Sequence, residues 1–152
     1  MKILVIKFRH IGDVLLSSVL AKNLKEIYPG STVDYLVNAE SIDMLTLNPN
    51  IDNVYGYDRK KAKKSRFLGR ISYELSLFKN IIKNRYDIVI NTTEGERGGY
   101  IAMLSGAKTK VGIAAKKGVF SKFSPYTHEF RLTLFRHIVE SNLDTLRILG
   151  YE

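Results

Sequence analysis

Cysteine is absent from this sequence, and only three of its 152 residues are proline. Without thiols, disulfides and thiolate metal sites are excluded, and a cytoplasmic location is expected. No apolar run approaches the roughly 18 residues that a membrane-spanning helix needs. The first apolar run, residues 3–6, is interrupted by Lys7 and Arg9 and lacks a cleavage site, so a signal peptide is not expected either.

Acidic residues are missing from two stretches of the chain, which carries a net charge of +9. Residues 59–70 hold seven cations, and residues 97–128 hold five lysines, with no acid in either stretch. Concentrated positive charge predicts an anionic partner: a phosphorylated glycolipid, an anionic membrane surface or nucleic acid. A solvated basic loop without a partner is the alternative. The first stretch contains Arg59, Lys60, Lys61, Lys63, Lys64, Arg66 and Arg70.

Segments of strand and helix character alternate along the chain, which by its length and its 45% hydrophobic content is expected to form one domain. The opening apolar run is typical of a strand buried on both faces of a parallel sheet. We expect strands at residues 3–6, 32–37, 54–57, 87–91 and 110–113. We expect helices near residues 16–27, 41–47, 67–84, 100–104 and 135–150. This order predicts an α/β fold with a Rossmann-like, doubly wound, mostly parallel sheet.

The turn that contains Gly12 and Asp13 joins the first expected strand to the first expected helix. Open α/β sheets place their ligands at the carboxyl ends of the strands, so an acid presented there is a candidate for chemistry. Helix capping is the alternative role of Asp13, and the local pattern alone slightly favours it. Gly12 lets the backbone approach a ligand closely, or it is a plain turn glycine.

Three segments together resemble the ADP-heptose:lipopolysaccharide heptosyltransferases, the inverting glycosyltransferase family 9. Residues 3–29, ILVIKFRHIGDVLLSSVLAKNLKEIYP, match the family's apolar strand, Gly-Asp turn and helix ending near Tyr-Pro. The RHIGD form at residues 9–13 looks most like the branch that adds a later, inner-core heptose. Further matches are YDIVINTTEG at residues 86–95 and HIVE at residues 137–140. The resemblance spans essentially the whole chain.

The resemblance implies a GT-B glycosyltransferase, in which two Rossmann-like domains face each other across a cleft. Residues 1–152 would be the amino-terminal, acceptor-side domain, with the nucleotide-sugar domain outside this chain. The implied activity is transfer of heptose from ADP-heptose to the inner core of lipopolysaccharide. Because no donor-binding motif of the family has a counterpart here, the chain alone is expected to be inactive.

The resemblance also implies the partners of the protein. The acceptor would be a lipid A–core saccharide that carries phosphates and carboxylates, at an anionic inner-membrane surface, with the protein cytoplasmic and peripheral to that membrane. No nucleic acid is implied, and a homo-oligomer is possible. ADP-heptose would be a donor substrate, and neither a metal nor another cofactor is expected, since the three histidines show no metal-ligand spacing.

The resemblance gives Asp13 the role of general base, which deprotonates the acceptor hydroxyl as that oxygen attacks the anomeric carbon. Gly12, Arg9 and His10 are expected to line the same crevice. A cation beside the departing diphosphate, such as Lys7 or Arg9, would stabilise its developing charge.

Two further groups are expected to bind the acceptor. Thr93 and Glu94 follow an apolar strand and suit recognition of sugar hydroxyls, with an ordinary strand-to-helix turn as the alternative. Four of the cations in residues 59–70 are predicted to contact acceptor phosphates, since Arg binds phosphate bidentately and Lys acts as a point charge. These four are Arg59, Lys60, Lys63 and Lys64.

Two functions of other classes compete with glycosyl transfer. A basic nucleic-acid-binding α/β module would use residues 59–70, but aromatic residues are not interleaved there and no RNA- or DNA-binding motif is present. A non-catalytic, oligomerising remnant is the second alternative. The GERGG segment at residues 95–99 lacks the dinucleotide G-x-G-x-x-G pattern, and no phosphate-binding P-loop motif occurs.

Overall fold

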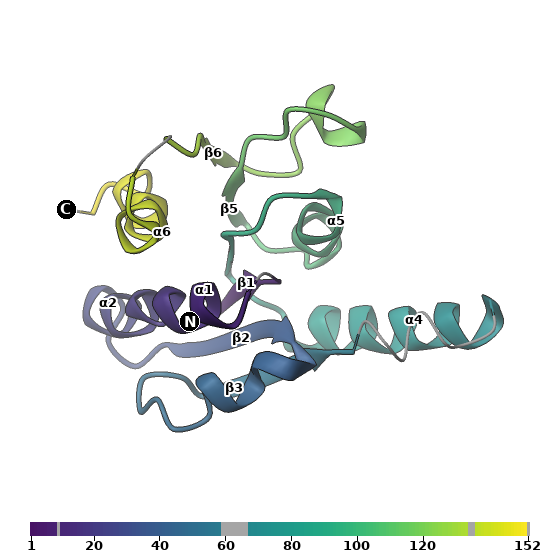
Figure 1. Ribbon diagram of the computed structural model, residues 1–152, viewed down its shortest axis with the longest axis horizontal. Helices are drawn as coiled ribbons and strands as arrows, with labels where there is room; N and C mark the ends of the chain where they lie inside the picture. Colours follow the sequence, from purple (N-terminus) through teal and green to yellow (C-terminus); the bar gives the residue numbers. More distant parts are fainter. Residues whose placement is uncertain (9, 59–66, 134–135, 152) are drawn as a thin grey trace.

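The sheet of this protein contains six strands, all parallel, in the order β3-β2-β1-β4-β5-β6 (Figure 1). A computed structural model describes residues 1–8, 10–58, 67–133 and 136–151. The strands are β1 (Lys2–Lys7), β2 (Thr32–Asn38), β3 (Asn53–Tyr57), β4 (Ile88–Asn91), β5 (Thr109–Ile113) and β6 (His128–Phe130). The predicted Rossmann-like α/β fold is confirmed.

The opening strand β1 lies between β2 and β4. Its apolar run predicted a strand that is buried on both faces of a parallel sheet, and this is confirmed. Because successive side chains of a strand point to opposite faces, β1 contributes to two separate cores. Ile3 and Val5 pack into one core, and Leu4 and Ile6 pack into the other. All four side chains are fully buried.

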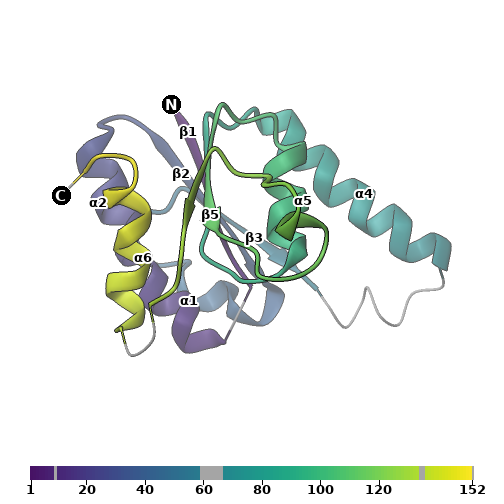
Figure 2. The same ribbon diagram turned by 90° about the horizontal axis from the view of Figure 1, so that it is seen from above.

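Helices cover both faces of the sheet (Figures 1 and 2). One face packs against α1 (Ile11–Ser17), α2 (Val19–Ile27) and α6 (Ile138–Arg147), and the other packs against α4 (Phe67–Asn84) and α5 (Glu96–Leu104). Two short 3₁₀ helices complete the described elements, η1 (Ala39–Met44) and η2 (Val119–Ser121). No helix within the described residues is long and apolar enough to cross a membrane.

Five local features differ from the sequence-based expectations. The helix expected at residues 41–47 is the 3₁₀ helix η1, and the last helix is shorter than the expected 135–150. Strand β6 and helix η2 were not predicted, because each contains three residues and neither has a periodic apolar pattern. The helix expected at residues 100–104 begins earlier, at Glu96.

The first helix is broken at Ser18 into α1 and α2, although its apolar stripe runs on without interruption. Two buried side chains bind the backbone carbonyls beside the break. The hydroxyl of Tyr35 donates to the carbonyl of Ser17 at 2.8 Å, and the amide of Asn142 donates to that of Leu16 at 3.4 Å. These two bonds tie α1 to the sheet and to α6, and so they fix the direction in which α1 leaves the sheet.

Removing the Tyr35 hydroxyl should therefore destabilise the fold. Tyr35→Phe leaves the Ser17 carbonyl buried without this donor, and we expect the free energy of unfolding in urea to fall by about 1–3 kcal/mol. Tyr100→Phe is the matched control, because the Tyr100 hydroxyl makes no hydrogen bond with any described residue. Equal stability losses in the two variants would contradict the role given to Tyr35.

Candidate active site at the carboxyl edge of the sheet

The carboxyl ends of β1, β4, β5 and β6 meet at one edge of the sheet, because all the strands are parallel. A small cavity of about 70 Å³ lies at this edge. It brings together Asp13 and Glu94, two acids that are 81 positions apart in the sequence. The cavity is lined by Lys7, Asp13, Thr92, Glu94, Ile113, Phe130, Leu132, Ile138, Ser141 and Asn142.

Asp13 is the third residue of α1, and its side chain is partly exposed to the cavity. Its carboxylate forms no hydrogen bond or ion pair with any described residue. The N-cap position of α1 belongs to His10, whose side chain makes no capping bond. Asp13 therefore does not act as a helix cap, and its oxygens are available to a bound molecule.

Lys7 places an ammonium group beside the two acids. It is the last residue of β1 and only 3% exposed. Its Nζ donates to the carbonyl of Thr92 at 2.9 Å, which joins the ends of β1 and β4. A buried ammonium needs such partners, because burying an unpaired charge is costly. The position puts a positive charge within the wall of the cavity.

The loop that leads from β1 to Asp13 is held on both sides by its neighbouring strands. The backbone N–H of Phe8 donates to the hydroxyl of Thr93 at 2.8 Å. The carbonyl of Phe8 accepts from the amide of Asn38 at 2.8 Å. Thr93, predicted to contact sugar hydroxyls, is thus buried and already bonded to the protein. Its observed contact orients the loop that carries Gly12 and Asp13.

Asn91 holds Thr93 in place through hydrogen bonds to its backbone. Its amide oxygen accepts from the Thr93 N–H at 3.1 Å, and its amide nitrogen donates to the Thr93 carbonyl at 3.1 Å and to the Tyr126 hydroxyl at 2.6 Å. Burial raises the pKa of Tyr126. Two glycines make room for this pair: a Cβ on Gly98 would overlap the Asn91 amide, and one on Gly112 would overlap the Tyr126 ring.

Sequence reasoning assigned no role to Asn38, Asn91 or Tyr126, which support the site without lining its cavity. Asn91 was visible as the polar residue that ends an apolar strand. Nothing in the local sequence marks Asn38 or Tyr126, because their importance arises only from contacts between distant strands.

The remaining predicted residues differ in where they lie. His10 and Gly12 are exposed, and a Cβ on Gly12 would meet nothing within 4 Å, so packing does not require this glycine. Glu94 is exposed at the rim of the cavity. Five predicted cations lie outside the described residues: Arg9, Arg59, Lys60, Lys63 and Lys64.

A second, wider cavity of about 250 Å³ adjoins the first and shares Glu94, Ile113 and Leu132 with it. Lys116 and Arg131 line this outer cavity, and both are exposed. Lys116 belongs to the acid-free stretch at residues 97–128. The two cations suit a carboxylate or phosphate held next to the inner cavity.

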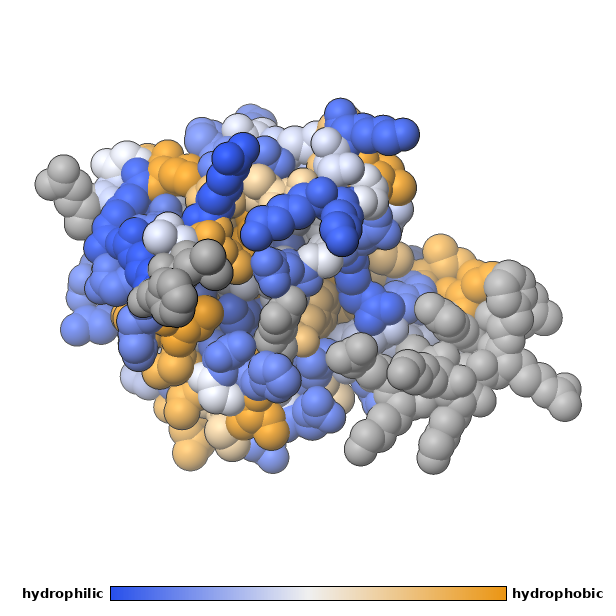
Figure 3. Space-filling model, turned by 45° about the horizontal axis from the view of Figure 1, so that its top comes forward, coloured by the Kyte–Doolittle hydropathy of each residue, from blue (hydrophilic) through white to orange (hydrophobic). Residues whose placement is uncertain are grey.

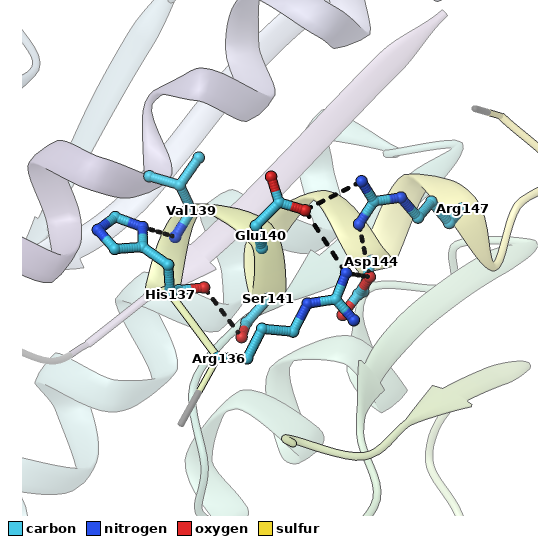
Figure 4. A network of polar contacts seen from close by, with 7 residues as sticks. All are labelled: Arg136, His137, Val139, Glu140, Ser141, Asp144 and Arg147. Atoms are coloured by element: carbon cyan, nitrogen blue, oxygen red, sulfur yellow. Dashed lines mark hydrogen bonds and ion pairs between the residues drawn. The ribbon is translucent and has the colours of Figure 1, made fainter. Parts of the chain in front are cut away.

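Helix α6 forms one wall of the inner cavity through Ile138, Ser141 and Asn142. The helix is capped by His137, whose Nδ1 accepts from the backbone N–H of Val139 at 3.2 Å (Figure 4). This bond gives His137 a structural role. In the described part of the chain, no group of three or more His, Asp or Glu side chains is placed to hold a metal ion.

Four charged side chains form a network along the exposed side of α6 (Figure 4). Arg147 pairs with Asp144 at 2.8 Å and with Glu140 at 3.0 Å. Arg136 reaches the same two acids, at 3.1 and 3.5 Å. Hydrogen bonds from Arg147 and Arg136 lower the pKa of the Glu140 carboxyl. All four side chains belong to α6 or to the residues just before it, so the network stabilises this helix internally.

Comparison with known proteins identifies relatives of the chain, although no family model matches it. It is 32% identical over 146 residues to lipopolysaccharide heptosyltransferase 3 of Escherichia coli, covering 95% of the chain and 42% of that protein. It is 24% identical to the lipopolysaccharide core heptosyltransferase OpsX of Haemophilus influenzae, covering 96% of the chain and 40% of that protein. The chain thus spans about two fifths of the length of these relatives.

Solved structures give the same assignment. One is a glycosyl transferase family 9 protein from Veillonella parvula, with a TM-score of 0.81 and 27% sequence identity. The match covers 99% of the present chain and 41% of the Veillonella protein. The E. coli heptosyltransferase WaaC with ADP has the same fold, with a TM-score of 0.83 and 19% sequence identity. This match covers 100% of the present chain and 48% of the WaaC chain. The resemblance predicted from the three motifs is therefore confirmed: the chain is a relative of the lipopolysaccharide heptosyltransferases and corresponds to part of their length.

Proposed function

We propose that the chain is the acceptor-side domain of an inverting glycosyltransferase that moves heptose from ADP-heptose to the inner core of lipopolysaccharide. The names of its relatives support the reaction class. The observation that carries the proposal is the Asp13 carboxylate, which lines a cavity at the carboxyl edge of the sheet and is bonded to no described residue. This placement suits a group that must accept a proton from a substrate.

In the proposed reaction, an acceptor hydroxyl enters the inner cavity and gives its proton to Asp13. The hydroxyl oxygen then forms a bond to the anomeric carbon of heptose, while the bond from that carbon to the diphosphate breaks on the opposite face. The electron pair of that bond leaves with ADP. The new bond forms opposite the broken one, so the anomeric configuration inverts.

The surrounding residues would position the acceptor. Glu94, at the junction of the two cavities, accepts hydrogen bonds from acceptor hydroxyls in this proposal. Lys116 and Arg131 hold an acceptor carboxylate or phosphate in the outer cavity. Arg9, His10 and Gly12, with the cations Arg59, Lys60, Lys63 and Lys64, remain proposed acceptor contacts, whereas the buried Thr93 would act by orienting the loop. The protein would work in the cytoplasm, at the inner face of the membrane that carries its acceptor.

Replacing Asp13 distinguishes between two roles of this residue, that of a general base and that of a structural residue. Asp13→Asn keeps the shape of the side chain but cannot take up the proton. In a protein that joins the chain to the remaining length of its relatives, we expect turnover to fall by about 10²- to 10⁴-fold. The free energy of unfolding should change by less than about 1 kcal/mol.

Asp43→Asn is the control for this substitution, because Asp43 is exposed on η1 and away from both cavities. Its turnover should equal that of the unmodified protein. Near-normal turnover of Asp13→Asn would mean that another group is the base, and Glu94→Gln would be measured next.

The outer cavity should contribute to acceptor binding through its two cations. We expect the double variant Lys116→Ala/Arg131→Ala to bind phosphorylated core saccharide about tenfold more weakly, and to show a smaller dependence of affinity on salt. The double variant Lys108→Ala/Lys122→Ala removes the same charge outside the cavity and should bind within about twofold of the original. Equal losses in both variants would show that only the overall charge matters.

Tighter binding of duplex or single-stranded nucleic acid than of the saccharide would favour the nucleic-acid function.

The chain alone should not catalyse transfer. It corresponds to about two fifths of its relatives' length, and we propose that the donor binds mainly to the remainder. A coupled assay of ADP release, with E. coli heptosyltransferase 3 as the positive control, should show no acceptor-dependent turnover by this chain. Turnover by the chain alone would contradict its assignment as an acceptor-side domain.

A further inference from the structure

Helix α4 turns three large apolar side chains toward solvent. Ile71, Leu75 and Ile82 are 40%, 61% and 48% exposed. At 3.6 residues per turn, these positions lie within about 40° of one another around the helix axis. They therefore form one stripe, which spans about 16 Å along α4 at 1.5 Å per residue.

The stripe borders the face by which α4 packs onto the sheet. Ile81 is buried in the core that contains Leu4 and Tyr86, and Leu77 and Phe78 pack against the same core. Around the helix axis, Phe78 lies about 20° from Ile71, so the packed and exposed side chains form one wide apolar surface. The sheet covers one part of this surface, and the described fold leaves the stripe uncovered.

The charges around the stripe are almost all positive. Lys79 and Lys83 are exposed and follow one side of it. The only acid within α4 is Glu74, which is turned to its neighbours: it accepts from the Tyr57 hydroxyl at 2.6 Å and pairs with Arg97 at 3.2 Å. The residues directly before α4 in the sequence, 59–66, add six cations.

The position of α4 leaves the stripe accessible. In both ribbon views, the amino-terminal half of α4 extends beyond the rest of the molecule (Figures 1 and 2). The space-filling view shows hydrophobic surface on this projecting end, at the right of the picture (Figure 3). An apolar stripe flanked by lysines, on a projecting helix, is the pattern of helices that lie in the headgroup region of a bilayer.

We propose that the stripe formed by Ile71, Leu75 and Ile82 inserts into the headgroup region of an anionic bilayer and seats the protein on it. Charge alone would hold the protein near such a surface. The stripe adds apolar contact, which persists when salt screens the charges. A second copy of the chain is the less suitable occupant, because pairing two α4 helices would bring two cationic surfaces together. The inference concerns seating on lipid and does not depend on the proposed transfer reaction.

Vesicle binding by the whole chain tests this proposal without any saccharide present. With vesicles of phosphatidylcholine containing roughly a quarter phosphatidylglycerol, Ile71→Ser/Leu75→Ser should weaken partitioning at least about tenfold. At about 0.5 M salt, the unmodified chain should retain measurable binding that this variant loses.

The double variant Met44→Ser/Leu47→Ser is the matched control. Both side chains are exposed, and the acids Glu40 and Asp43 lie close to them in the sequence. Its partitioning should stay within about twofold of the original, because acids disfavour an anionic surface. Equal partitioning of the stripe variant and the unmodified chain would overturn the proposal.

A second measurement keeps the test valid if the serine variant does not fold. Since the chain has no cysteine, Leu75→Cys provides a unique site for an environment-sensitive fluorophore. Its emission should shift to the blue when anionic vesicles are added, while the same label at Leu47→Cys should not shift. No shift at position 75 would overturn the proposal. So would a concentration-dependent dimer, seen by sedimentation, that Ile71→Ser/Leu75→Ser abolishes.

Discussion

The parallel pairing of β1 with β4 is the constraint on which the rest of the site depends. It places Ile6 beside Asn91, so that the next residues of both strands leave the sheet together. Lys7 then reaches the carbonyl of Thr92, and the Phe8 N–H reaches the Thr93 hydroxyl. A shift of one residue in this register would move every buried side chain of β1 to the other face. Burial on both faces therefore determines where the loop that carries Asp13 begins.

The polar groups at this edge fall into two sets with different tasks. Asn38, Asn91 and Thr93 are buried and bonded to backbone groups, and they hold the loop in place. Asp13 and Glu94 line the cavity, with Lys7 in its wall. Groups that must keep a fixed geometry need such rigid support beneath them.

Much of the fold could be predicted because its signals are local. The apolar run of β1 and the alternation of strands and helices are visible in the sequence itself, and they determine the sheet. The break at Ser18 could not be predicted, because the two side chains that bind the adjacent carbonyls come from β2 and α6. The three residues of β6 form a strand only because β5 is beside them.

The residues of the site can likewise be divided into those that the local sequence identified and those that it did not. Asp13 and Glu94 follow apolar strands and were recognisable from that position. The bond from Phe8 that engages Thr93 depends on a strand that is distant in the sequence. The helix-cap alternative for Asp13 failed for a local reason, because α1 begins at Ile11 and His10 is therefore its N-cap residue. Local pattern favoured the cap, because an acid in the first turn of a helix is usually found in that role.

The hydrogen bond between Asn142 and the Leu16 carbonyl has a mechanical consequence for the cavity. It couples the helix that carries Asp13 to the helix that contributes Ile138, Ser141 and Asn142 to the cavity wall. Moving the two helices apart would break this bond and leave the buried Asn142 amide without this partner. The adjoining outer cavity carries the cations Lys116 and Arg131. The Asp13 carboxylate thus has positive charge both in the wall of its own cavity, at Lys7, and in the neighbouring cavity.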